Sequence, residues 1–123
     1  MKLKFPFITI CILTGGISAA GCAQTIPTPE VSWADVAPIF INRCSSCHSG
    51  QLPAALLRLD SREGLLKGSQ IGSVVKAGDP KSSILMRRIE GSIRPRMPMN
   101  GPPFLTNDEV SRIRSWIEQG LAE

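Results

Sequence analysis

The residues of this chain that are best suited to chemistry lie together in the segment Cys44-Ser45-Ser46-Cys47-His48. Two thiols at this spacing stand about one helical turn apart and can add to the two vinyl groups on one edge of a porphyrin. The histidine that follows directly would lie beneath the porphyrin iron, where an imidazole nitrogen can bind the metal. The spacing therefore indicates covalent attachment of one haem through Cys44 and Cys47, with His48 as an iron ligand.

Three other interpretations of this segment fit the rest of the chain less well. A thioredoxin-like redox pair needs a βαβ context, and no strand–helix–strand pattern flanks the motif. A structural zinc site needs four ligands, whereas the part of the chain after residue 23 offers two thiols and one imidazole. A disulfide between Cys44 and Cys47 would close a loop too short to stabilise the fold much. Haem attachment is favoured, and a covalently bound haem would add the stabilisation that so small a domain needs beyond its own core.

The second face of such an iron cannot be held by another imidazole, because the chain has a single histidine. Met1 belongs to the N-terminal export segment, and Met86 falls in a predicted helix as ordinary core. Met97 and Met99 lie in a proline-rich stretch, residues 92–105, which is expected to be a stiff loop because proline disrupts helices and central strands. Such a loop can hold a thioether, a neutral and soft ligand, in a fixed place. The other role of these two side chains is to fill gaps in the core.

The first 23 residues are typical of an export signal. Two lysines precede an apolar stretch at residues 5–17, which is shorter than the ~20 residues that cross a bilayer. Cleavage after Ala23 is one alternative. Cleavage before Cys22 is the other, because residues 19–22 resemble a bacterial lipobox, and a lipid on Cys22 would also explain an unpaired cysteine in an exported protein. Both alternatives predict a periplasmic or otherwise exported protein, whose contact with a membrane is limited to a lipid on Cys22.

Length and charge limit what the remainder can be. A chain of 123 residues forms one small domain. Its 14 basic and 10 acidic residues give a net charge of +4, which falls to +2 without the two N-terminal lysines. That excess is too mild to indicate a nucleic-acid partner. The single histidine also excludes metalloproteases of the HExxH type and multi-haem chains.

The segment before the motif is predicted to be a linker followed by a helix. Residues 24–30 form a proline- and threonine-rich linker that stays extended. A helix is expected from near Ser32 to Asn42, capped by Ser32 or Asp35, with Pro38 tolerated only in its first turn. Its apolar residues recur at helical spacing. This helix would deliver Cys44 to the edge of the haem.

Three further helices are predicted after the motif. Residues 56–59 are a short apolar run that is strand-like or extended, and Asp60 is expected to cap a short helix that stops at Gly68. Asp79-Pro80 is expected to open a helix that ends at Gly91. The last helix opens on the capping box Thr106–Glu109 and runs to about Gln119. Its predicted buried face comprises Val110, Ile113, Trp116 or Ile117, and Leu121.

Together these stretches resemble the class I cytochromes c, and most of all the small bacterial monohaem cytochrome c domains that end in a methionine–proline loop and an amphipathic helix. The resemblance covers nearly all of the chain after Pro29. It divides the chain into a signal peptide at residues 1–23, of lipoprotein type if Cys22 is acylated, a linker at 24–30 and a cytochrome c domain at 31–123. The stretches that carry it are Val36-Ala37-Pro38-Ile39-Phe40, Cys44 to His48, Arg58-Leu59-Asp60-Ser61-Arg62, Gly78-Asp79-Pro80-Lys81-Ser82-Ser83, Arg96-Met97-Pro98 and Trp116-Ile117-Glu118-Gln119-Gly120.

The resemblance implies an all-α cytochrome c fold, with three to five short helices packed around one covalently bound haem c and its iron. It implies thioether bonds at Cys44 and Cys47, His48 as the proximal iron ligand and Met97 as the distal one. Met99 stands where the pattern usually has proline, which makes it the second choice for the distal ligand. The resemblance also implies that an aromatic side chain four residues before the first cysteine packs against one in the last helix.

The function implied is that of a one-electron carrier in electron transport, which is not an enzyme. The alternative is a haem-based ligand sensor, or an accessory domain of a haem enzyme, in which the methionine ligand is labile. Redox partner proteins are expected, and no nucleic acid.

Four arginines gather before and within the proline loop: Arg87, Arg88, Arg94 and Arg96. They have three possible uses, which are docking of an acidic redox partner, pairing with the two haem propionates, and solvation of a modestly basic face.

Overall fold

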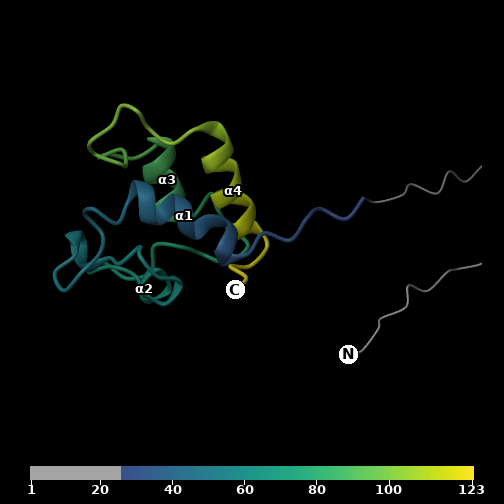
Figure 1. Ribbon diagram of the computed structural model, residues 1–123, viewed down its shortest axis with the longest axis horizontal. Helices are drawn as coiled ribbons and strands as arrows, with labels where there is room; N and C mark the ends of the chain where they lie inside the picture. Colours follow the sequence, from purple (N-terminus) through teal and green to yellow (C-terminus); the bar gives the residue numbers. More distant parts are fainter. Residues whose placement is uncertain (1–25) are drawn as a thin grey trace, which may run out of the picture.

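The computed structural model describes residues 26–123, and the regular elements of this part are all helical (Figure 1). The part described holds four α-helices and one 3₁₀ turn, and its β structure is limited to an isolated bridge between Ser69 and Gly72. The all-α prediction is therefore confirmed. The predicted signal segment, with Cys22, lies outside the described residues. The elements are α1 (Trp33–Arg43), η1 (Ala54–Leu56), α2 (Arg62–Lys67), α3 (Ile84–Glu90) and α4 (Asn107–Glu118).

Helix α1 begins after Ser32, whose backbone N–H and hydroxyl both donate to the Asp35 carboxylate at 2.8 Å. These hydrogen bonds lower the pKa of Asp35. The prediction that Pro38 would lie in the first turn was wrong, because it lies in the middle of α1. Proline there removes the N–H that would bond to the carbonyl of Ala34. Both residues are exposed, so water can satisfy that carbonyl.

The core forms where α4 packs against α1 and α3. Trp33 and Phe40 of α1 stack with ring centroids 5.5 Å apart, and Trp116 of α4 meets the Phe40 ring edge-on at 6.3 Å. Phe40 and Trp116 are fully buried, as is Ile113. The expected contact between these two aromatic residues is therefore present. It fixes α1, and with it the chain that leads into the cysteine motif.

Helix α4 follows its predicted boundaries closely. The Thr106 hydroxyl accepts from the backbone N–H of Glu109 at 3.2 Å, and the Glu109 carboxylate accepts from the N–H of Thr106 at 2.7 Å. This is the capping box expected from the sequence. Of its predicted face, Ile113, Trp116, Ile117 and Leu121 are buried, whereas Val110 is partly buried against the core.

Helix α3 starts later than predicted. Asp79 caps a separate turn, because its carboxylate accepts from the N–H of Ser82 at 3.1 Å. The Ser83 side chain is buried and joins two parts of that turn: it donates to the carbonyl of Asp79 and accepts from the N–H of Lys76, both at 2.9 Å. The helix itself begins only at Ile84 and ends at Gly91, as predicted, in a left-handed conformation with φ 80°.

The short helix α2 is capped by Ser61, whose hydroxyl accepts from the N–H of Gly64 at 3.1 Å, rather than by Asp60. Asp60 instead pairs with Arg58 at 2.7 Å. The expected strand-like run is also different. Only its first residue, Leu56, belongs to η1, in which Ala55 and Leu56 both have φ 56°, and the backbone is extended at Leu57.

The linker is fastened beside the C-terminus, at the end of α1 remote from the cysteine motif (Figure 1). The Gln119 amide accepts from the N–H of Val31 at 2.7 Å and donates to the carbonyl of Pro29 at 3.2 Å. The N–H of Trp33 donates to the carbonyl of Ala122 at 3.0 Å. Within residues 26–123, no helix is both long and apolar enough to cross a membrane.

Candidate functional site

The cysteine motif forms a tight turn directly after α1. The backbone N–H groups of Cys44 and His48 donate to the carbonyls of Phe40 and Cys44, each at 2.9 Å, which continues the helical path for one more turn. Both thiols are free; Cys44 is partly buried against the core, and Cys47 is exposed. The turn therefore presents one thiol at its surface and keeps the other close to the core.

Burial raises the pKa of the Cys44 thiol to about 11, and the neighbouring Arg43 guanidinium opposes that rise only in part. Desolvation disfavours the charged thiolate. Cys44 is thus a neutral thiol at physiological pH, which limits its reaction with other disulfides and electrophiles because the thiolate is the nucleophile.

The His48 ring is oriented by two backbone carbonyls. Its Nδ1 lies 3.1 Å from the oxygen of Ala54 and 3.3 Å from that of Leu57. A carbonyl oxygen can only accept a hydrogen bond, so Nδ1 is the donor here, and in the neutral imidazole Nε2 then carries the lone pair that can bind a metal. Metal-bound histidines are commonly oriented in this way, by a hydrogen bond from the nitrogen that does not bind the metal.

The left-handed residues of η1 have a role in that arrangement. Ala55 and Leu56, both with φ 56°, reverse the chain between the two carbonyls that face His48. Such backbone is costly for residues other than glycine and tends to occur at functional sites. The sequence carries no glycine or asparagine here that would signal it. The prediction of extended chain accordingly missed this turn.

Large apolar side chains are exposed around the same turn. Leu52 is 90 %, Leu56 60 % and Ile71 69 % exposed. The N–H of Gln70 donates to the carbonyl of Ala55 at 2.9 Å, which brings the chain before Ile71 beside η1. Two free thiols and an imidazole with a free Nε2 supply groups that can bond a haem and its iron, and the exposed apolar side chains near them supply a surface that can pack against its ring.

The proline-rich loop, residues 92–105, lies against the motif turn. Pro98 and Asn100 line a small hollow of about 120 Å³ together with Ser46, one of the two serines between the cysteines. Met97, next to Pro98, is half-buried, and its N–H donates to the carbonyl of Arg88 at 2.9 Å. The structure therefore brings the loop that carries Met97 beside the turn that carries the thiols.

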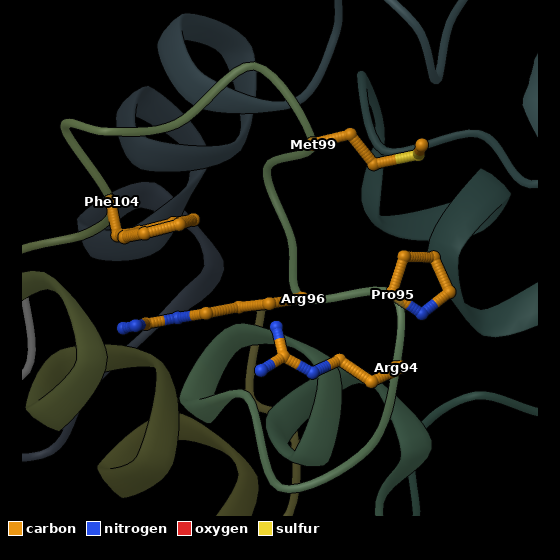
Figure 2. Close-up of a pocket in the computed structure, with 5 residues that line it drawn as sticks. All are labelled: Arg94, Pro95, Arg96, Met99 and Phe104. Carbon is orange, nitrogen blue, oxygen red and sulfur yellow. The ribbon is translucent and has the colours of Figure 1, made fainter.

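Met99 occupies a different position from Met97. Its side chain is 71 % exposed and lines an open hollow of about 550 Å³ on the loop, shown in Figure 2. Arg94 and Phe104 line the same hollow. Met86, in contrast, is 1 % exposed in α3, which confirms its prediction as core.

Two of the four clustered arginines hold the loop. Arg96 lies flat against the Phe104 ring, with its guanidinium carbon 3.9 Å from the ring centroid, and its Nε donates to the carbonyl of Ile89 at 3.3 Å (Figure 2). Arg88 donates to the carbonyl of Pro95 at 3.2 Å. Both side chains therefore have structural partners.

The other two arginines of the cluster, Arg87 and Arg94, are exposed. Within residues 26–123, neither forms a salt bridge.

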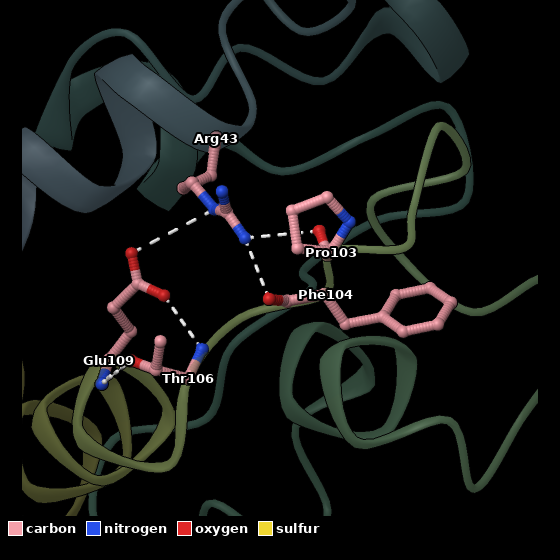
Figure 3. Close-up of polar contacts among 5 residues, drawn as sticks. All are labelled: Arg43, Pro103, Phe104, Thr106 and Glu109. Atoms are coloured by element: carbon pink, nitrogen blue, oxygen red, sulfur yellow. Dashed lines mark hydrogen bonds and ion pairs between the residues drawn. The ribbon is translucent and has the colours of Figure 1, made fainter.

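Arg43 is a site residue that the sequence analysis did not single out. Its guanidinium reaches from the end of α1 to the carbonyls of Pro103 and Phe104 and toward the Glu109 carboxylate (Figure 3). Its position offered one signal, since it is a charged residue on the apolar face of a helix, directly before Cys44. Its partners lie about sixty residues away and cannot be read from local pattern.

Among residues 26–123, no three His, Cys, Asp or Glu side chains cluster closely enough to hold a metal ion by themselves. Comparison with protein families finds that residues 44–101 match the family described as Planctomycete cytochrome C. The matched segment begins at the first cysteine of the motif and ends beyond Met99. No curated protein and no solved structure matches the chain. The match supports a cytochrome c-like domain.

Proposed function

We propose that this protein is an exported monohaem c-type cytochrome that carries single electrons. In this proposal Cys44 and Cys47 form thioether bonds to the haem, His48 is the proximal iron ligand and Met97 the distal one. The observation that carries it is the His48 ring, whose Nδ1 is held by two backbone carbonyls and whose Nε2 is free, directly after a pair of free thiols. The family match over residues 44–101 supports the same reading.

Met97 is favoured over Met99 by its surroundings. A thioether is a weak ligand and needs a fixed position. The backbone of Met97 is tied to α3 through Arg88, and its side chain is half-buried, whereas Met99 is largely exposed on the other side of Pro98. Histidine–methionine ligation raises the potential of a haem iron.

Electron transfer is favoured over catalysis because two fixed axial ligands leave no open position for a substrate. A bound haem would supply the Fe(III)/Fe(II) couple. The chain's own residues orient the imidazole, shield the Cys44 side of the turn with the aromatic core and restrain the methionine loop. The competing function is a haem-based ligand sensor, or an accessory domain of a haem enzyme, in which the methionine is released readily.

The proposed location is outside the cytoplasm, in the periplasm or a similar exported compartment. This location rests on the signal-like N-terminal segment and on the haem-attachment motif at Cys44 to His48. The fastening of the linker by Gln119 supports a related arrangement: a tether at Cys22 would approach the domain at the start of α1, away from the motif at its other end.

An acidic redox partner is proposed to dock beside the methionine loop. Arg87 and Arg94 support this, because they are exposed while Arg88 and Arg96 are engaged within the fold. Opposite charge on a partner would accelerate encounter at low ionic strength.

The experiment that tests the proposal is spectroscopic. The purified protein should retain a haem stain after denaturing electrophoresis and show the weak far-red absorption of an iron–thioether bond in its oxidised form. Met97→Ala should abolish that absorption and Met99→Ala should leave it. Loss in Met99→Ala alone would assign the distal ligand to Met99. Rapid binding of carbon monoxide by the reduced wild type would favour the sensor.

A further inference from the structure

We infer that Arg43 is a positioning residue that holds the methionine loop against the haem-attachment turn and so keeps the Met97 thioether in place. This inference rests on the proposed function, because it takes Met97 as the distal ligand. It adds a residue that lies outside the cysteine motif and outside the loop itself. Its basis is the set of contacts that the Arg43 guanidinium makes with two other parts of the chain (Figure 3).

One arm of the guanidinium fastens the end of the loop. The same Nη2 donates to the carbonyl of Phe104 at 2.7 Å and to that of Pro103 at 3.1 Å. Both are hydrogen bonds from a charged donor, which are stronger than neutral ones. Arg43 is the last residue of α1 and directly precedes Cys44. The link therefore joins the loop to the backbone that carries the first thioether site.

The other arm faces Glu109 at the start of α4. The Arg43 Nε is buried, has no hydrogen-bond partner and lies 3.8 Å from the Glu109 carboxylate. That carboxylate is held by the N–H of Thr106 at 2.7 Å, so its position is set by the capping box. The glutamate balances the charge of the arginine and leaves its Nη2 protons for the loop carbonyls.

The loop is thus tied down at two places, and Met97 lies at the end of the first, where the stretch that Arg43 fastens begins. Its first half is fastened to α3 by Arg88 and Arg96 and by the N–H of Met97 itself. Within the described part of the chain, the hydrogen bonds from residues 98–105 to elements outside the loop are those with Arg43. Removing this side chain would free the second half of the loop while leaving the first half attached.

The expected consequence is easier displacement of the thioether. One hydrogen bond to a charged group corresponds to about a tenfold change in an equilibrium constant. External imidazole competes with Met97 for the oxidised iron, so its apparent affinity reports how readily the loop opens. Arg43→Gln should raise that affinity about tenfold or more and weaken the far-red absorption. Arg43→Lys keeps the charge beside Glu109 but loses the planar fork, and should lie between wild type and Arg43→Gln.

Two controls separate positioning from general destabilisation. Arg112→Gln removes an exposed arginine of α4 that pairs with Asp108 at 2.9 Å, and should leave imidazole affinity unchanged. Trp116→Phe weakens the core without touching the loop. If Trp116→Phe lowers the melting temperature as much as Arg43→Gln and raises imidazole affinity equally, Arg43 acts through stability alone and the inference is overturned.

The outcomes distinguish this inference from the proposed function. If wild type shows the far-red absorption, Met97→Ala abolishes it and neither Arg43 variant changes imidazole affinity, the ligand assignment stands and the role of Arg43 is refuted. If Met97→Ala keeps the absorption, the assignment fails, and amide exchange still tests the tether: the N–H of Gly101, bonded to Pro98 at 3.2 Å, should exchange faster in Arg43→Lys than in wild type. Equal exchange would refute the tether, and this conservative variant provides the test even if Arg43→Gln does not fold.

Discussion

The three-ring cluster that joins α1 to α4 predicts a graded loss of stability at Trp116. This side chain is fully buried, contacts Phe40 and Trp33, and donates its Nε1 proton to the carbonyl of Ala122 at 2.8 Å. Trp116→Ala should lower the free energy of unfolding by about 3–5 kcal/mol, the usual cost of deleting a buried aromatic side chain. That is a large part of the 5–15 kcal/mol that stabilises a typical domain.

Trp116→Phe should cost much less, roughly 1–2 kcal/mol. An aromatic ring remains to meet Phe40, and the hydrogen bond that is lost contributes about 1 kcal/mol. The Ala122 carbonyl does not lose its last partner, because the N–H of Trp33 also donates to it at 3.0 Å. At about 4–8 °C per kcal/mol for a domain of this size, the melting temperature should fall by roughly 4–16 °C for the phenylalanine variant and roughly 12–40 °C for the alanine variant.

Thermal unfolding followed by circular dichroism measures both changes on protein with the same haem content. Haem content matters because a bound group stabilises the folded state. The reasoning is refuted if the two variants are equally destabilised, or if alanine costs less than 1 kcal/mol. Either result would mean that the indole is not packed between α1 and α4 as described.

Three further predictions concern pH, thiol chemistry and partner docking. The Ser82 hydrogen bonds and Lys76 lower the pKa of Asp79 to about 2. The Asp79 carboxylate therefore stabilises the fold fully above the ordinary carboxyl pKa of about 4, and this contribution is lost as the pH falls toward 2. The difference in melting temperature between wild type and Asp79→Asn should shrink over that range, and a constant difference would contradict the shift. In protein produced without haem ligation, iodoacetamide at pH 8 should alkylate exposed Cys47 before partly buried Cys44, as followed by peptide mass spectrometry. Equal rates would contradict the raised pKa of Cys44. Arg94→Glu should slow electron exchange with an acidic redox protein at low salt and have little effect at high salt; rates equal to wild type at every ionic strength would remove the docking proposal.

Elements with strong local signals could be predicted from the sequence. The capping box of Thr106 and Glu109 places the start of α4 correctly, and Gly91 marks the end of α3. In both cases the signal is local: the capping-box residue types make a short-range hydrogen bond, and glycine readily adopts the left-handed conformation that ends a helix. The apolar spacing of the last helix likewise identifies Ile113 and Leu121 as core and leaves Trp116 and Ile117 as alternatives, both of which are buried.

Features that depend on distant contacts could not be predicted. Asp79 and Pro80 are typical of a helix start, but the buried Ser83 hydroxyl holds these residues in a separate turn. The left-handed pair in η1 follows from the placement of two carbonyls around His48, for which the sequence has no local marker. Arg43 is the clearest example, because its role depends on carbonyls about sixty residues away.

In the candidate site, the sequence identifies the reactive groups, and the structure shows which other residues hold them in position. The spacing of Cys44, Cys47 and His48 is sufficient to predict haem attachment, since the chemistry depends on neighbouring residues. The orientation of the imidazole by Ala54 and Leu57 and the fastening of the loop by Arg43 are tertiary features. They determine how well a ligand is held, which residue types alone do not reveal.

Mass spectrometry of the denatured protein, after expression with a working haem-ligation apparatus and export, tests the central claim most directly. We expect a red protein whose mass exceeds that of the processed chain by one haem, and a variant with alanine at both Cys44 and Cys47 should lack this added mass. A colourless wild-type protein at the mass of the bare chain would contradict it.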